Sequence, residues 1–285
     1  MRHRARTMVF EYPAVYLPFA RRKYPGPSPA VIGPETELVI DGYFRSANTF
    51  SVYAFQLSQD KLVRLAHHLH APAQLIEAAR SGIPALLLVR QPRDAILSEL
   101  LYDPVALPDA MVAYSRFYTS LLPYLDSFVV GEFTQVTSDF GAVIRRLNAR
   151  FGTSFAEFRH SEANTRECLA LVRQRGTLSD VILGFESGVV TREELSRELP
   201  ALERKSKPPE LREAWVPSQE RSRAKAALLE QWLSPGLARL RDRTQFVYEQ
   251  VRSAAAPSPT SSTSSRTRAV GTSRSSSSRR ETRAS

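Results

Sequence analysis

Segment 38–50, with the sequence LVIDGYFRSANTF, predicts a buried strand, a tight polar turn and the start of a helix. Leu38, Val39 and Ile40 form an apolar run that is typical of a strand buried on both faces of a sheet. The run breaks at Gly42, and a helical pattern of apolar residues follows soon after. Free backbone N–H groups and the positive end of the helix dipole converge at such a turn, so it is suited to bind a phosphate.

The side chains of the turn strengthen the prediction of an anion site. Arg45 adds a full positive charge, and Ser46 and Thr49 add hydroxyl donors. The alternative is that these polar residues merely cap the helix, since many strand-to-helix turns in α/β proteins bind nothing. The Walker pattern GxxxxGK[ST] is absent from the turn, which excludes an ordinary loop for nucleoside triphosphates.

Further apolar runs predict a three-layer α/β domain over residues 37–252, with a mostly helical part from residue 155 to residue 250. We expect further strands at 62–69, 85–89 and 127–130, and helices at 72–82, from Pro92 onward, at 107–124 and at 137–151. This alternation is typical of a parallel sheet with helices on both faces and right-handed crossovers.

The two ends of the chain differ from its middle. Residues 1–36 form a basic arm whose many prolines favour extended backbone over helix, and whose aromatic residues should pack along the domain. Residues 253–285 are nearly all Ser, Thr, Arg and Ala, which predicts a disordered tail. The whole net charge of +10 lies at the ends, because residues 1–24 and 253–285 each hold six Arg or Lys against one Glu. The middle is neutral, so nucleic acid is not an expected partner.

The compartment follows from two absences in the sequence. No apolar run is long enough to cross a bilayer, and the N-terminal stretch lacks the pattern of a cleaved signal peptide. Cys168 is the one cysteine, so no disulfide can form within the chain. A reducing cytoplasm is therefore the expected location, whereas the oligomeric state has no signal in the sequence.

A second cationic residue follows the third predicted strand. Arg90 opens the sequence RQPRDAILS, which ends at Ser98. Because the carboxyl ends of parallel strands share one edge of a sheet, we expect Arg90 to lie near Arg45. Arginine at both strand ends, in place of an acidic metal ligand, suits a ligand with two separated phosphates and no metal. The alternative is that Arg90 forms an ion pair with Asp94 or with another acidic residue.

Three histidines stand at the end of the second predicted strand. Alternation places His68 and His70 on one face and His67 on the other. They invite a zinc interpretation, but no acidic or cysteine partner is evident nearby, so no metal is expected. An imidazole that accepts a proton near neutral pH is favoured instead, with a plain strand cap as the alternative, above all for His67.

Three motifs, in order, resemble the family of sulfotransferases that use 3′-phosphoadenosine 5′-phosphosulfate (PAPS). DGYFRSANTF resembles the family's 5′-phosphosulfate loop, [YF]P[KR]SGTTW, and RQPRDAILS resembles its 3′-phosphate motif, R-x-P-[RK]-D-x-x-x-S. HAPAQLI resembles the H-x-P segment that supplies the catalytic base. The resemblance covers residues 37–151 and implies a parallel sheet of the P-loop type.

The resemblance also implies roles for individual residues. His70 would be the catalytic base, His68 falls where many members have a lysine near the transferred group, and Arg45 would stabilise the leaving phosphate. Residues that would bind the co-substrate are Arg45, Ser46, Ala47, Asn48, Thr49, Arg90, Ser98 and Arg204. Ala47 and Asn48 replace the usual Gly-Thr, and the segment at Arg204 matches the family's Arg-Lys-Gly lid without its glycine.

Sulfuryl transfer from PAPS to a hydroxyl or amine is the leading functional hypothesis, with a small molecule, a glycan or a glycolipid as the acceptor. One alternative is a P-loop nucleotide kinase with a degenerate loop, for which Glu132 is the best candidate metal ligand. Another is a module that binds an adenine nucleotide without catalysis. No pattern within residues 155–250 indicates the acceptor, and the charged residues of its helices are expected to lie on solvated faces.

Overall fold

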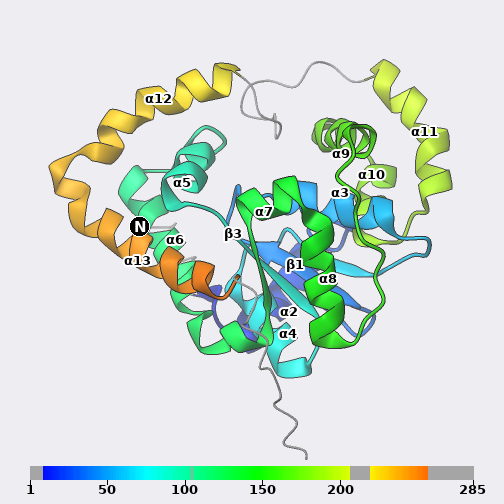
Figure 1. Ribbon diagram of the computed structural model, residues 1–285, viewed down its shortest axis with the longest axis horizontal. Helices are drawn as coiled ribbons and strands as arrows, with labels where there is room; N and C mark the ends of the chain where they lie inside the picture. The colour runs from blue at the N-terminus through cyan, green and yellow to red at the C-terminus, as the bar shows by residue number, and fades with distance from the viewer. Residues whose placement is uncertain (1–8, 104, 206–218, 256–285) are drawn as a thin grey trace, which may run out of the picture.

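The apolar runs form one parallel sheet with the strand order β2-β1-β3-β4 (Figure 1). The computed structural model describes residues 9–103, 105–205 and 219–255, although not the side chains of 202–205. Its strands are β1 (Leu38–Gly42), β2 (Leu65–His67), β3 (Ala85–Val89) and β4 (Val129–Glu132). The predicted parallel α/β architecture is thereby confirmed.

Alternate residues of the central strands point to opposite faces of the sheet. Ile40 lies beside Leu86 in the register, and both belong to one apolar cluster. Val39 and Leu87 belong to a second cluster on the other face. Both faces are covered, so every residue of β1 and β3 is buried, as expected for inner strands of a parallel sheet.

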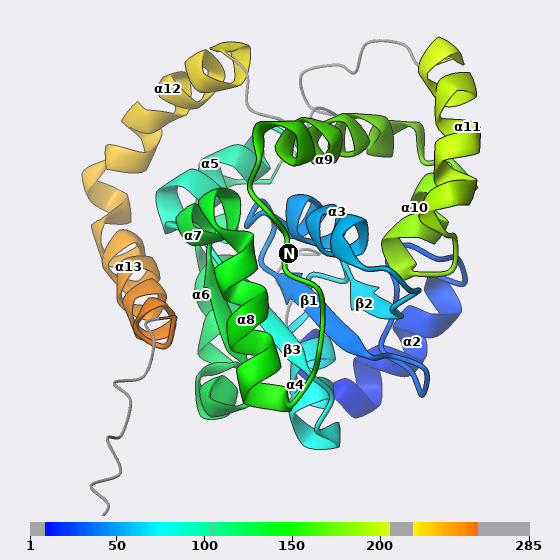
Figure 2. The same ribbon diagram turned by 45° about the vertical axis from the view of Figure 1, so that its right-hand side comes forward.

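Helices cover both faces (Figure 2). The face of Ile40 carries α3 (Asn48–Ser58), α8 (Phe140–Phe151), α9 (Glu162–Gln174) and α10 (Asp180–Ser187). The face of Val39 carries α2 (Pro13–Lys23), α4 (Pro72–Ser81), α6 (Leu107–Thr119) and α13 (Ala238–Ser253). The remaining helices are α5 (Pro92–Leu100), α7 (Phe133–Ser138), α11 (Arg192–Lys205) and α12 (Gln219–Leu233), with 3-10 turns at Leu122–Ser127, Arg175–Thr177 and Pro235–Leu237.

The N-terminal arm is helical from Pro13 to Lys23, so the expectation of extended backbone is wrong for this part. Pro13 stands in the first turn, where the missing N–H bonds nothing, and Pro18 is tolerated inside the helix. Tyr16 and Leu17 are buried against the domain, and this packing offsets the hydrogen bond lost at Pro18. The expected packing of the arm along the domain is confirmed.

Several boundaries differ from the sequence prediction for local reasons. Strand β2 ends at His67 because His68 adopts a left-handed conformation with φ 57°. The helix predicted at 137–151 is divided into α7 and α8 at Asp139, whose carboxylate accepts a hydrogen bond of 3.1 Å from the Ala142 N–H and caps α8.

The C-terminal part is helical where the structure describes it. The chain from residue 162 to residue 255 contributes α9 to α13 and two 3-10 turns, with the gap at 206–218. The predicted disordered tail lies outside the described residues from 256 onward. None of the described helices combines the length and apolar character needed to cross a membrane.

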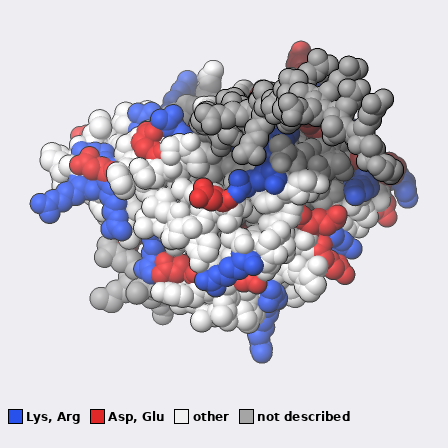
Figure 3. Space-filling view, turned by 60° about the horizontal axis from the view of Figure 1, so that its bottom comes forward, with Lys and Arg blue, Asp and Glu red and all other residues white. Residues whose placement is uncertain are grey.

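Charges on the surface are mixed rather than segregated on the face that Figure 3 brings forward. Blue and red groups alternate there around a wide uncharged area, without a large field of one sign. A continuous positive groove, which a long polyanion would need, is not visible on this face.

Candidate functional site

The two arginines predicted to meet at the sheet edge do so. Arg90 follows β3, and its Nη1 donates a hydrogen bond of 2.9 Å to the backbone carbonyl of Arg45 in the turn after β1. The Nε of Arg45 donates a hydrogen bond of 3.0 Å to the Oγ of Ser98 on α5. The turn after β1, the end of β3 and helix α5 therefore join at one point, as the strand-end rule predicts.

The backbone of the turn is held in an unusual conformation. Arg45 has φ 64° and Ala47 has φ 72°, and the left-handed region is uncommon for residues with a Cβ. Ala47 is the N-cap of α3, and no described side chain caps this helix. Asn48 instead donates a hydrogen bond of 3.0 Å back to the carbonyl of Tyr43. The first N–H groups of α3 thus remain available beside Arg45.

The hydroxyl groups of the turn contact the protein interior. The Ser46 hydroxyl is buried and lies 3.4 Å from the hydroxyl of Tyr118. The Oγ1 of Thr49 lies 3.0 Å from the Nε2 of His68. Both side chains therefore fix the shape of the turn, and their direct contact with a ligand stays a prediction.

Helix α12 brings two further cations to the arginine pair. Arg221 is 4% exposed, and its Nη2 lies 3.4 Å from the Oγ of Ser98. Lys225 follows one turn later, and its pKa falls to about 8, first because of burial and then because of the nearby Arg90 charge. Burial, followed by the charges of Arg221 and Arg90, likewise lowers the pKa of Arg45 to about 9. The neighbouring positive charges thus disfavour the charged forms of Arg45, Arg90 and Lys225, so an anion would stabilise this site.

These two residues escaped the sequence analysis, which assigned the charged residues of the C-terminal helices to solvated faces. That prediction is wrong for Arg221. Arg221 lies 123 residues after Ser98 in the chain, and no motif marks its segment. The only signal in the sequence was a run of basic residues on a predicted helix, which most surface helices share.

Arg90 is not neutralised by its neighbour. Its guanidinium carbon lies 3.8 Å from the ring centre of Phe133, and burial lowers its pKa. Asp94 lies near Arg93 instead, with 3.6 Å between Oδ1 and Nε. Within the described chain Arg90 forms no ion pair with Asp94 or with another acidic residue, so that alternative is wrong, although the nearby Asp94 and Glu132 charges oppose the lowering of its pKa.

His70 is held in the form that a general base requires. Its Nδ1 lies 2.8 Å from the carbonyl of Gly42, and because a carbonyl only accepts, Nδ1 carries the hydrogen and Nε2 the lone pair. Among the described residues, none hydrogen-bonds Nε2. Burial lowers the pKa of His70 to about 4, so the ring is neutral at pH 7 but is a weaker base than the free imidazole that the sequence analysis expected.

Asp41 lies behind His70 and was not predicted from the sequence. Its Oδ1 is 3.5 Å from the Nδ1 of His70, and its carboxylate accepts hydrogen bonds from the N–H groups of Gly42 and His70 and from Gln74. Burial raises the pKa of Asp41 to about 7. The signal was present in LVIDG, since an acidic residue in a buried strand needs partners to be tolerated.

A cavity of about 420 Å³ opens beside His70. Its walls are largely aromatic and include Phe10, Tyr16, Tyr24, Tyr43, Phe44, Tyr102 and Phe117. Glu99 also lines the cavity, and its Oε2 accepts a hydrogen bond of 2.5 Å from the hydroxyl of Tyr43. Burial raises the pKa of Glu99 to about 7. A ring-shaped or apolar molecule fits such walls, within reach of the His70 imidazole.

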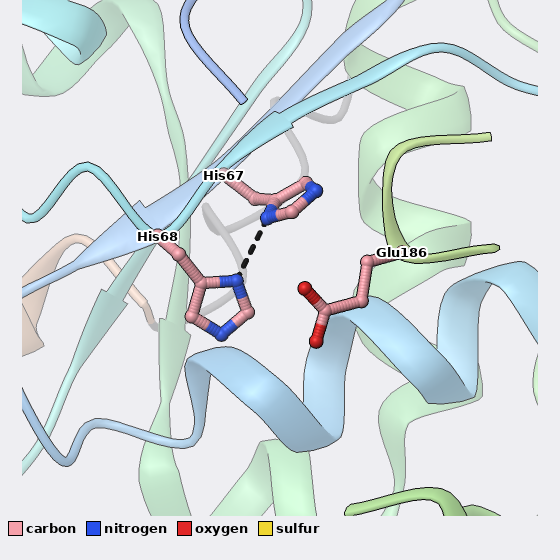
Figure 4. Close-up of side chains that lie close together, drawn as sticks. All are labelled: His67, His68 and Glu186. Atoms are coloured by element: carbon pink, nitrogen blue, oxygen red, sulfur yellow. Dashed lines mark hydrogen bonds between the residues drawn. The ribbon is translucent and has the colours of Figure 1, made fainter. Parts of the chain in front are cut away.

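His67 and His68 lie side by side, so the prediction of opposite faces is wrong. The left-handed backbone at His68 turns its ring toward His67, and their Nδ1 atoms are 2.7 Å apart (Figure 4). Glu186 of α10 points at both rings, with ligand atoms of all three residues within 4.8 Å of one another. The acidic partner that the sequence did not reveal thus comes from a distant helix.

Charge and spacing favour a hydrogen-bonded network over a metal centre at these three residues. The Oε1 of Glu186 already accepts hydrogen bonds from the Nε of Arg175 at 2.5 Å and from the hydroxyl of Tyr53 at 2.7 Å. The positive Arg175 also helps to lower the pKa of both histidines, after burial, and would repel a bound cation in the same way. Two nitrogens on one tetrahedral zinc lie about 3.3 Å apart, given Zn–N bonds of about 2.0 Å, so the two Nδ1 atoms at 2.7 Å are too close to bind one zinc together.

His68 and Arg204 are the two predicted site residues that remain. Both ring nitrogens of His68 are engaged, by His67 and by Thr49, whereas no described residue hydrogen-bonds the Nε2 of His70; both histidines line the cavity. Arg204 lies in the last turn of α11, and its side chain is outside the described part of the chain. Its contact with a ligand stays a prediction.

No model of a known protein family matches the chain, and the search of curated proteins found no significant match. The function therefore has to be argued from the geometry of the site.

Proposed function

We propose that this chain is a cytoplasmic sulfotransferase of the P-loop type, which transfers the sulfuryl group of PAPS to a hydroxyl or amine of a small-molecule, glycan or glycolipid acceptor. The observation that supports the proposal is the meeting of Arg45, Arg90 and Ser98 at one edge of the sheet. These residues belong to two separate motifs of the resemblance, and they lie in direct contact.

The charges suit a ligand with two phosphates. Arg45 and the N–H groups at the start of α3 would bind the 5′-phosphosulfate. Arg90 and Ser98 would bind the 3′-phosphate, with Arg221 and Lys225 of α12 beside them. No described carboxylate forms an ion pair with Arg45, Arg90 or Lys225, so the positive charge is available to a ligand.

The histidine suits the transfer itself. The Nε2 of His70 would take the proton of the acceptor as the acceptor oxygen or nitrogen forms its bond to sulfur. The bond between sulfur and the phosphate oxygen breaks in the same step, and Arg45 would stabilise the charge left on that phosphate. Arg45 would act through its charge and not as an acid, since a guanidinium keeps its proton in proteins.

Calorimetry with 3′,5′-adenosine bisphosphate tests the proposal. We expect the intact protein to bind this product analogue and Arg90→Ala to weaken binding at least 30-fold, as loss of about 2 kcal/mol from a charge-assisted contact implies. Arg93→Ala is the matched control, because Arg93 is half-exposed on the same segment and pairs only with Asp94. Absence of binding, or equal binding by Arg90→Ala, would refute the proposal.

The alternatives give different outcomes in the same apparatus. A nucleotide kinase predicts tighter binding of Mg-ATP than of the bisphosphate, although Glu132, its candidate metal ligand, accepts a hydrogen bond of 2.8 Å from the Thr134 N–H and caps α7. A non-catalytic module predicts binding without transfer. Incubation of the protein with labelled PAPS and a mixture of small molecules and glycans separates that outcome from catalysis.

A further inference from the structure

Helix α2 exposes an apolar face to solvent. Tyr12, just before the helix, and Val15 and Phe19 within it are 57%, 61% and 58% exposed. The described residues include ten exposed large hydrophobic side chains. Four of the ten lie within residues 9–19, namely Val9, Tyr12, Val15 and Phe19. Such a concentration is unusual for the surface of a soluble domain and marks an interaction site.

The opposite face of the same helix is apolar too. Tyr16, Leu17 and Ala20 are buried in the domain. No charged residue occurs from residue 12 to residue 20, whereas a surface helix normally carries polar residues on its outer face. Figure 2 shows α2 at the lower right edge of the molecule, where nothing described covers its outer side. The sequence of the helix therefore calls for a second apolar environment.

The charged residues next to the apolar face indicate what kind of surface would cover it. Arg21, Arg22 and Lys23 fill the last turn of α2 and are exposed. The acidic residue nearest in sequence is Glu11, which is paired with Arg116 at 2.6 Å. It therefore does not compensate the positive charges of this last turn. Aromatic and aliphatic side chains on one side, followed by a cluster of cations, match the boundary of an anionic bilayer. A protein partner would have to supply an apolar groove and an acidic rim together.

We propose that α2 docks the protein on the surface of an anionic membrane, with Tyr12, Val15 and Phe19 in the interface and Arg22 and Lys23 on the lipid head groups. The helix lies in the membrane plane and does not cross it. This proposal does not depend on the reaction that the site performs.

Docking through α2 also positions the cavity. Tyr16, on the buried face of the helix, lines the cavity beside His70, as do Phe10 and Tyr24 at either end of the helix. A helix is about 10 Å across, so the cavity lies within about one helix diameter of the docked surface. A molecule carried in the membrane is thereby brought close to the His70 imidazole.

Vesicle sedimentation tests the proposal with the full chain. Vesicles of phosphatidylcholine with about 30% phosphatidylserine should bind the protein, and we expect Tyr12→Ser combined with Phe19→Ser to weaken binding about tenfold or more. Arg22→Ala combined with Lys23→Ala should weaken it about 30-fold at low salt, at about one kcal/mol for each cation. Arg21 is kept, because its Nη2 donates a hydrogen bond to the carbonyl of Ile32.

The basic tail can attract the protein to anionic vesicles by itself. The substitutions of apolar residues are therefore the ones that test docking through α2. Phe246→Ser is the matched control, since Phe246 on α13 is 65% exposed and should not affect binding. In a Phe19→Trp variant, vesicles should shift the fluorescence of the new tryptophan to the blue. Absence of that shift, or equal loss from Phe246→Ser, would overturn the proposal. So would a dimer in solution that Tyr12→Ser with Phe19→Ser dissociates, because a second copy would then cover the face.

Discussion

Arg90 donates a hydrogen bond of 2.9 Å to the backbone carbonyl of Arg45, and this contact joins residues 45 positions apart. It fixes the turn after β1 in its left-handed conformation and holds two guanidinium groups at one edge of the sheet. Like charges held together in this way destabilise the protein until an anion arrives. The site is thus preorganised for a ligand at a cost to the stability of the free protein.

Lys225→Met should show both that the clustered positive charge destabilises the free protein and that it contributes to ligand binding. The pKa of Lys225 is lowered to about 8, so folding disfavours its charged form at every pH below that value. We therefore expect the variant to melt a few degrees higher than the wild type without ligand at pH 7. It should gain less than the wild type when 3′,5′-adenosine bisphosphate is added. Scanning calorimetry with and without the bisphosphate measures both effects, and a lower melting temperature without ligand would contradict this account.

The central sheet and the arginine contact could be predicted from the sequence because each follows from a local pattern and a general rule. β3 is a continuous apolar run, and the parallel arrangement then brings Arg45 and Arg90 to the same edge. No comparable rule places Arg221 or Glu186, which reach the site from helices more than 100 residues away. Their positions depend on tertiary packing alone.

The histidines show a second limit of sequence reasoning. Alternation along a strand assumes extended backbone, but His68 and His70 have φ 57° and φ 51°. Positive φ is costly for residues with a Cβ and is not encoded in a short pattern. The rings of His67 and His68 therefore meet, although the strand pattern predicted that they would point apart.

Glu99→Gln should change how stability depends on pH. The pKa of Glu99 is raised by burial from 4.5 to about 7, so between these values the unfolded chain has lost a proton that the folded chain keeps. Rising pH therefore costs the wild type up to about 3 kcal/mol of stability through this group. Glutamine keeps the hydrogen bond from Tyr43 and has no proton to lose. The free energy of unfolding can be measured in urea at pH 4.5 and pH 7.5. Relative to the wild type, the variant should be more stable at pH 7.5 than at pH 4.5. The same difference in free energy at both pH values would contradict the prediction.

If the proposed reaction takes place, His70→Ala should strongly reduce the sulfuryl transfer and leave the binding of the bisphosphate nearly unchanged. The Nε2 of His70 is the unengaged imidazole nitrogen at the cavity, so its loss should reduce transfer from labelled PAPS at least about 100-fold. Calorimetry should find binding of the bisphosphate within about threefold of the wild type, since the phosphate contacts remain. His160→Ala is the control, because His160 accepts a hydrogen bond of 3.1 Å from the Phe140 N–H at the start of α8 and does not line the cavity beside His70. Equal transfer by His70→Ala would remove His70 from the mechanism.

Glu186→Gln tests whether the histidine network is structural. Glu186 is buried and pairs with Arg175 at 2.5 Å, so the substitution removes the negative charge that faces a largely buried guanidinium. Removing one member of such a pair costs about 3 kcal/mol or more of unfolding free energy. Glu157→Gln is the matched control, because the pair of Glu157 with Arg145 is exposed and contributes less than about 1 kcal/mol. Zinc should raise the melting temperature of neither the wild type nor the variant, since Arg175 neutralises the carboxylate. A zinc-dependent rise in the wild type that Glu186→Gln removes would show instead that His67, His68 and Glu186 bind the metal.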